Sequence, residues 1–102
     1  MKAPSHLREE TQAWFRLVLD GYDLEPHHVR LLMLAGEAWD RALEARETLE
    51  GEGAYYMDRF GQPRAHPAVG VERDSRIAFA RLLRELDLDG EPAPDPRLRR
   101  RR

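Results

Sequence analysis

The chain has 102 residues, of which 41% are hydrophobic and 35% charged, and this is enough for one modest core and too short for two domains. It contains no cysteine, and no stretch approaches the roughly 20 continuous apolar residues of a membrane span, so disulfides, thiolate metal sites and a spanning helix are excluded. The net charge of −2 divides unevenly, because five of the 17 basic residues lie in the last six positions and residues 1–96 carry 12 basic and 19 acidic residues.

The first predicted element is a helix over about residues 5–20. Ser5 has the side chain of an N-cap, apolar residues from Leu7 to Leu19 recur at helical spacing, and Asp20-Gly21 ends the pattern. The residues before this helix lead into charges and not into an apolar run. We therefore expect no secretory signal and, given the absence of cysteine, an intracellular location.

A second, longer helix is predicted over residues 26–50, with Pro26 at its first position. It carries two apolar stripes. One has large side chains, namely Val29, Leu32, Trp39 and Leu43, and the other has mostly smaller ones, namely Leu31, Leu34, Ala35, Ala38, Ala42, Ala45 and Leu49. A helix with two apolar faces packs against two neighbouring elements. Either one face meets a neighbouring subunit, or the first and third helices of the same chain cover both.

Residues 54–65 predict a short β-hairpin or an ordered loop, because Tyr-Tyr-Met favours a strand and Asp-Arg-Phe-Gly favours a turn. Pro67 then opens a third helix, predicted over residues 67–88. Its apolar stripe comprises Ala68, Val71, Ser75, Ala78, Phe79, Leu82 and Leu86, with Ile77 and Leu83 beside it. The fold class is therefore mainly α, with one helical assembly domain over residues 1–90.

Residues 91–102 form the remaining segment, a proline-rich linker followed by a basic tail. Proline at every second position from 92 to 96 excludes a helix there. The tail carries Arg97, Arg99, Arg100, Arg101 and Arg102. Guanidinium groups on a spacer can contact phosphates without fixed geometry, so the tail is a candidate contact for nucleic acid. Docking to an acidic partner protein, or no function, are the alternatives.

The search for catalytic chemistry in the sequence is negative. His27 and His28 are adjacent and do not share a ligand face of a helix, and no zinc-protease spacing occurs. The carboxylates are spread along amphipathic helices, and no glycine-rich phosphate loop is present. We therefore assign no catalytic residue, metal or cofactor. A metal-dependent hydrolase built on His27 or His28 remains a third hypothesis, which metal analysis of the purified protein would decide.

Four stretches in order resemble the small subunit of tailed-phage DNA-packaging terminases. They are YDLEPHHVRLL at 22–32, AWDR at 38–41, DRFGQPRAHP at 58–67 and ERDSRIAFARLLRELDL at 72–88. The closest group is the short-chain family of phages that package by cutting concatemers, and the resemblance spans about residues 7–90. The link at residues 20–25 is not a clear version of the helix-turn-helix that many such subunits carry.

The resemblance implies a non-catalytic protein that forms a ring, recognises double-stranded phage DNA in the host cytoplasm and regulates a separate large subunit with ATPase and nuclease activity. It implies no cofactor and no membrane partner. Ring assembly would use the smaller stripe of the second helix with part of the third. The expected interface residues are Leu31, Leu34, Ala38, Trp39, Ala42, Ala45, Leu49, Ile77 and Leu83.

The alternative function is a small helical DNA-binding regulator that acts as a dimer. A two-fold dimer on a palindromic site and a larger cyclic ring differ in stoichiometry, which discriminates the two. The tryptophans and Phe79 fall on apolar helix faces in both cases. They are either interface anchors or ordinary core residues.

Overall fold

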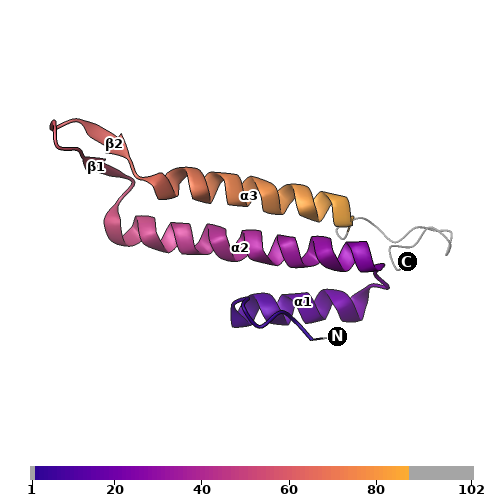
Figure 1. The fold of residues 1–102 in the computed structure, drawn as a ribbon. Helices are drawn as coiled ribbons and strands as arrows, with labels where there is room; N and C mark the ends of the chain where they lie inside the picture. Colours follow the sequence, from indigo (N-terminus) through magenta and orange to yellow (C-terminus); the bar gives the residue numbers. More distant parts are fainter. Residues whose placement is uncertain (1, 88–102) are drawn as a thin grey trace.

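The computed structural model describes residues 2–87, which form three helices and one two-stranded antiparallel sheet (Figure 1). In chain order the elements are α1 (Glu9–Gly21), α2 (Pro26–Glu52), β1 (Tyr55–Met57), β2 (Pro63–Ala65) and α3 (Pro67–Leu86). The helices α2 and α3 lie side by side and antiparallel, and the β-hairpin continues beyond their shared end. The shorter α1 lies against only the first part of α2, so the molecule is elongated, 62 × 26 × 19 Å.

Small side chains on α2 allow α3 to pack closely against it. The side chains of Ala35, Ala38, Ala42 and Ala45 are all buried. Helix α3 runs beside α2 along most of its length, whereas α1 lies against only the first part of α2. On α3 the buried residues include Ala68 and Ser75, which are also small. Within one chain, therefore, the alanines of the smaller stripe are covered, whereas Leu34 of the same stripe is 46% exposed.

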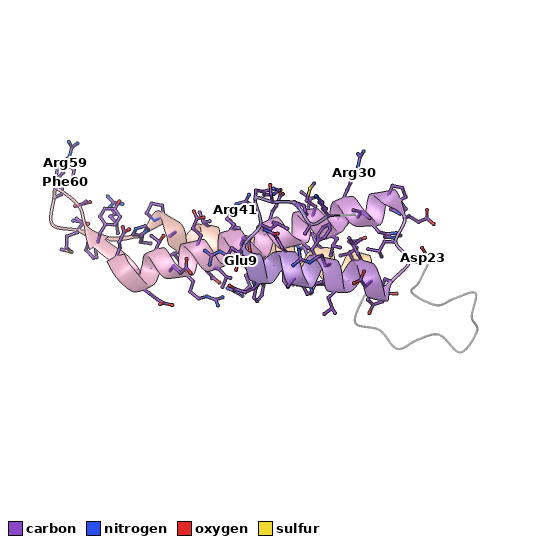
Figure 2. The ribbon with its side chains drawn as sticks, turned by 90° about the horizontal axis from the view of Figure 1, so that it is seen from below. Glu9, Asp23, Arg30, Arg41, Arg59 and Phe60 are labelled. Atoms are coloured by element: carbon purple, nitrogen blue, oxygen red, sulfur yellow. The ribbon has the colours of Figure 1, made fainter. Side chains whose placement is uncertain are left out.

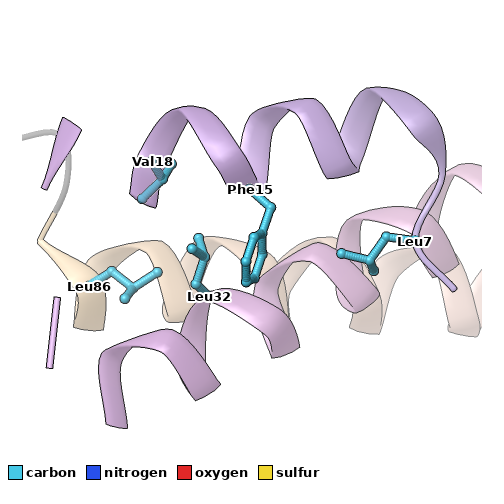
Figure 3. Close-up of a cluster of buried hydrophobic side chains, with 5 residues drawn as sticks. All are labelled: Leu7, Phe15, Val18, Leu32 and Leu86. Atoms are coloured by element: carbon cyan, nitrogen blue, oxygen red, sulfur yellow. The ribbon is translucent and has the colours of Figure 1, made fainter. Parts of the chain in front are cut away.

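The hydrophobic core lies where all three helices meet. It comprises Leu7, Phe15, Val18, Leu32 and Leu86, and Figure 3 shows Phe15 and Leu32 meeting between α1 and α2. Phe15 and Leu32 are 0% exposed. Full burial of such a side chain contributes about 1.5–3 kcal/mol, so this cluster fixes α1 on the other two helices. The larger stripe of α2 thus has an occupant in the same chain.

Gly36 lets the segment before α1 approach α2. A Cβ at this position would lie 3.2 Å from side-chain carbons of both Leu7 and Thr11. Glycine therefore gives α1 its close seat, although it costs helix propensity in the middle of α2. Among residues 2–87, no helix is long and apolar enough to cross a membrane.

The predicted three helices and hairpin are confirmed, with shifts at their ends. The first helix begins at Glu9 and not at Ser5, and Arg8 occupies its N-cap position without a side-chain cap of its own. The expectation of a Ser5 cap was wrong, because residues 5–6 form a turn and the carbonyl of Arg8 accepts the first helical hydrogen bond. The second helix runs to Glu52 and the third ends at Leu86. The predicted segment 91–102 lies outside the described residues.

Substitution of Phe15 by alanine should lower the free energy of unfolding by about 3–5 kcal/mol, because it opens a cavity at the junction of the three helices. Leu17, on the same helix, is 70% exposed and provides the matched control. Leu17→Ala should change the free energy of unfolding by no more than about 0.5 kcal/mol. Urea denaturation followed by circular dichroism measures both, and equal losses would contradict this core assignment.

Candidate functional site

The β-hairpin has a well-defined turn organised by Asp58. Its carboxylate accepts hydrogen bonds from the backbone N–H of Phe60 at 2.8 Å and of Gln62 at 3.0 Å, and from Nε of Arg64 at 2.9 Å. Gly61 has a φ of 74°, a conformation that glycine adopts without strain. The strands pair from Tyr55 opposite Ala65. These bonds give the tip of the hairpin one shape.

The hairpin exposes its large apolar side chains instead of burying them. Tyr55 is 72% exposed, Tyr56 48%, Met57 64% and Phe60 72%. The guanidinium of Arg59 lies over the ring of Phe60, 5.0 Å from its centroid. A two-stranded hairpin gains little stability alone, and a cluster of exposed apolar residues marks a surface that contacts something else. Figure 2 shows Arg59 and Phe60 at one extreme end of the molecule.

An aromatic groove lies between the three helices, away from the hairpin. Trp14 of α1 and Trp39 of α2 flank Phe79 of α3, with ring centroids 5.9 Å and 5.0 Å from the central ring. Glu10 and Thr11 complete the lining of an open groove of about 330 Å³. Trp39 is 42% exposed. The groove is therefore an accessible, mainly apolar hollow and not part of the closed core.

Asp40 of α2 anchors the beginning of α1. Its carboxylate accepts hydrogen bonds from the backbone N–H of Arg8, at 2.8 Å, and from the hydroxyl of Thr11. Arg8 is the N-cap residue of α1, so Asp40 binds its backbone N–H from another helix, as the Glu or Gln of a capping box does from within the same helix. The negative charge of Asp40 also lies near the positive end of α1.

Ion pairs extend this anchor along the helices. Arg8 binds Glu47 through two hydrogen bonds of 2.8 Å and 2.9 Å, which lowers the pKa of that carboxyl. His6 lies 2.7 Å from Glu37. Further along, Glu72 of α3 accepts from Arg46 of α2 and from Arg76, and both guanidinium groups hold its pKa below the ordinary value. These ion pairs therefore connect α2 both to the start of α1 and to α3.

The expected interface residues separate into two groups. Leu34, Trp39 and Ile77 are exposed in the single chain, at 46%, 42% and 40%. Ala38, Ala42 and Ala45 are buried, and Leu31, Leu49 and Leu83 are partly buried. The alanines thus already have a partner surface in the same chain. The arginines expected at a nucleic-acid contact, at positions 97 and 99–102, lie outside the described residues.

The histidines are engaged with neighbours in the fold. The rings of His27 and His28 lie 4.0 Å apart at the start of α2. His66 accepts the N–H of Ala68 as the N-cap of α3 and lies 2.9 Å from Glu52. Over residues 2–87, no group of three or more histidine, aspartate or glutamate residues has the arrangement to hold a metal ion.

Two features of these surfaces were not predicted from the sequence. The sequence did contain an indication that the hairpin is exposed. Tyr55, Tyr56 and Met57 are consecutive apolar residues, and a short strand in so small a chain cannot bury both of its faces. The role of Asp40 had no such indication, because its partners lie about 30 residues away in the sequence.

No protein-family model matches the chain, and searches of the curated proteins and of the solved structures gave no match either. The chain is therefore assigned to no family on these grounds.

Replacement of Asp40 by alanine should lower the free energy of unfolding by about 1–3 kcal/mol, because the donors of Arg8 and Thr11 lose their acceptor. Asp40→Asn retains one carbonyl oxygen and should recover part of this loss. Hydrogen exchange of the α1 amides measures the effect locally, and α1 should exchange faster in Asp40→Ala than in the wild type. Unchanged protection of α1 would contradict the anchoring role.

The hairpin turn should depend on pH through Asp58. Hydrogen bonds from the Gln62 amide, the Arg64 guanidinium and the Phe60 amide hold the pKa of Asp58 below its ordinary value of about 3.9. Because the folded pKa is the lower one, the carboxylate stabilises the turn fully above about pH 4 and loses this effect as the pH falls through the folded pKa. The amide chemical shifts of Phe60 and Gln62 report the transition.

Asp58→Asn is the control for this titration, since the amide cannot ionise. The difference in amide shifts between wild type and variant should follow one titration with a midpoint below about 3.9. A midpoint at or above that value would show that the three hydrogen bonds do not hold the charged form.

Proposed function

We propose that this chain is a non-catalytic, ring-forming protein of the terminase small-subunit kind, which binds double-stranded phage DNA and regulates a large ATPase–nuclease subunit. The resemblance over about residues 7–90 motivates the proposal. The observation that carries its assembly part is the apolar surface left uncovered by the chain's own helices. Leu34, Trp39, Ile77 and the hairpin residues Tyr55, Met57 and Phe60 are each at least 40% exposed.

The distribution of this surface favours a ring over a two-fold dimer. The exposed residues lie both at the hairpin end and beside the three-helix end of an elongated molecule. A self-complementary dimer needs one patch that meets its own copy, whereas two separate patches support head-to-tail contacts, which generate rings when the rotation closes.

The DNA-binding part of the proposal depends on the arginine tail. The rest of the chain, residues 1–96, has a net charge of −7 and repels a polyanion on average. Five arginines in the last six residues can instead neutralise phosphates. Such contacts position a protein on DNA without reading its sequence. In this proposal the tail contacts DNA or docks the large subunit, and the exposed apolar residues contact neighbouring copies of the chain.

Deletion of residues 97–102 should weaken DNA binding and reduce its dependence on salt. Each neutralised phosphate contributes about 0.9 to the slope of log affinity against log salt concentration, so loss of five arginines should reduce the slope by up to about 4.5. Fluorescence anisotropy with duplex DNA between 50 and 300 mM salt (about the range where the effect is large) measures it. Replacement of the five arginines by lysine is the control and should keep most of the slope.

Native mass spectrometry of the same proteins tests assembly. The full chain and the truncated chain should both give a cyclic oligomer larger than a dimer, because the tail lies outside the helical domain. In the anisotropy experiment, an unchanged slope of log affinity against log salt concentration in the truncated chain would show that the tail does not bind DNA. A monomer at high concentration would reject the ring, and a two-fold dimer would favour the dimeric regulator.

A further inference from the structure

The molecule carries one projecting apolar feature and one hollow apolar feature, and each is left open in the single chain. The projecting feature is the hairpin tip with Arg59 and Phe60. The hollow feature is the groove lined by Trp14, Trp39 and Phe79. We propose that the hairpin tip of one copy seats in the aromatic groove of a second copy. This inference rests on the proposed assembly and names the surfaces that make it.

The two features do not meet within one chain. The part of α2 from Trp39 to Glu52 spans about 20 Å at a rise of 1.5 Å per residue. The hairpin then continues away from α2, and Figures 1 and 2 place its tip at the far end of the molecule. The backbone turns and hydrogen bonds around Asp58 hold that direction. Contact between tip and groove therefore requires a second copy.

The groove suits an aromatic side chain. Its walls are three aromatic rings from three different helices, and the central Phe79 is tilted by 53° and 52° to its neighbours. Aromatic rings prefer such tilted or offset arrangements, and a further ring can join them at similar distances. A groove of about 330 Å³ accommodates the ring of Phe60, which is 72% exposed on the hairpin.

The charges beside the two features are opposite in sign. Arg59 lies over the ring of Phe60, so it accompanies that ring to any surface that Phe60 contacts. Glu10 lines the groove and is exposed. The nearby Arg8 is attracted to Glu10 but forms its two side-chain hydrogen bonds with Glu47, and the exposed Glu10 carboxylate is accessible to a cation from a second copy. Seating Phe60 therefore brings Arg59 toward Glu10.

The contact is heterologous, because each copy gives a hairpin to one neighbour and a groove to the other. Contacts of this type close into rings when the rotation between copies permits it. The two tryptophans of the chain both line the groove, so its occupancy has its own optical signal. Intrinsic fluorescence therefore distinguishes this contact from association through any other surface.

The test compares Phe60→Ala with Val71→Ala, an exposed residue of α3 outside both features. Phe60→Ala should weaken self-association roughly tenfold or more, as loss of a central aromatic anchor does. Its tryptophan emission should shift to the red and match that of diluted wild-type protein. Val71→Ala should leave both quantities unchanged. Thermal melting of dilute protein should be the same for both variants, because both side chains are exposed in the single chain.

A charge exchange tests the pairing itself. Arg59→Glu and Glu10→Arg should each weaken association, and the double variant should recover most of the wild-type affinity. The pairing of tip and groove would be overturned if the double variant associated no more tightly than the more weakly associating single variant. Sedimentation velocity over a concentration series measures all four proteins.

The outcomes separate this inference from the proposed function. An oligomer that survives Phe60→Ala overturns the tip-in-groove contact and leaves the ring proposal standing. Loss of association without any change in tryptophan emission also overturns it, because the hairpin then contacts a different surface. A wild-type chain that stays monomeric overturns both.

Discussion

The close packing of α3 on the alanines of α2 is the contact on which the rest of the structure depends. Because Ala35, Ala38, Ala42 and Ala45 are small, the two long helices can lie side by side along most of their length. The larger rings of Trp39 and Phe79 contact each other beside these alanines, with centroids 5.0 Å apart, and Trp39 is 42% exposed. The same pair of helices carries the β-hairpin at its far end. The positions of the exposed hairpin and of the aromatic groove therefore both depend on the packing of α3 against α2.

Helix α1 is attached to this pair in a different manner. Apolar contacts of Phe15 and Leu32 provide its burial, whereas its starting point is set by the carboxylate of Asp40. Polar groups thus define where α1 begins, and the core defines which face it turns inward. Because α1 covers only one end of the α2–α3 pair, it also forms one wall of the aromatic groove through Trp14. The groove exists only while α1 is in place.

The elements of this fold could be predicted from local patterns, whereas its surfaces could not. Pro26 and Pro67 marked both long helices correctly, since a proline at the first helical position is a local signal. The sequence predicts a start at Ser5, whereas α1 begins at Glu9, and the contact of Arg8 with Asp40 of another helix leaves no local signal. The two stripes of α2 were visible in the sequence, but periodicity does not reveal whether a neighbouring helix or a neighbouring chain covers them. In the structure the alanines are buried within the single chain, and Trp39 is 42% exposed.

The difference in length between α1 and α2 has a consequence of its own. Helix α1 has 13 residues and α2 has 27, so the part of the α2–α3 pair nearest the hairpin extends beyond α1 as two helices alone. This two-helix segment separates the hairpin from the groove without contributing to the three-helix core. Its length determines the distance between them: addition or removal of two helical turns in both helices would move the hairpin by about 10 Å and leave the core unchanged. In an assembly built from contacts between the hairpin tip and the groove, the length of this segment would set the spacing between successive copies.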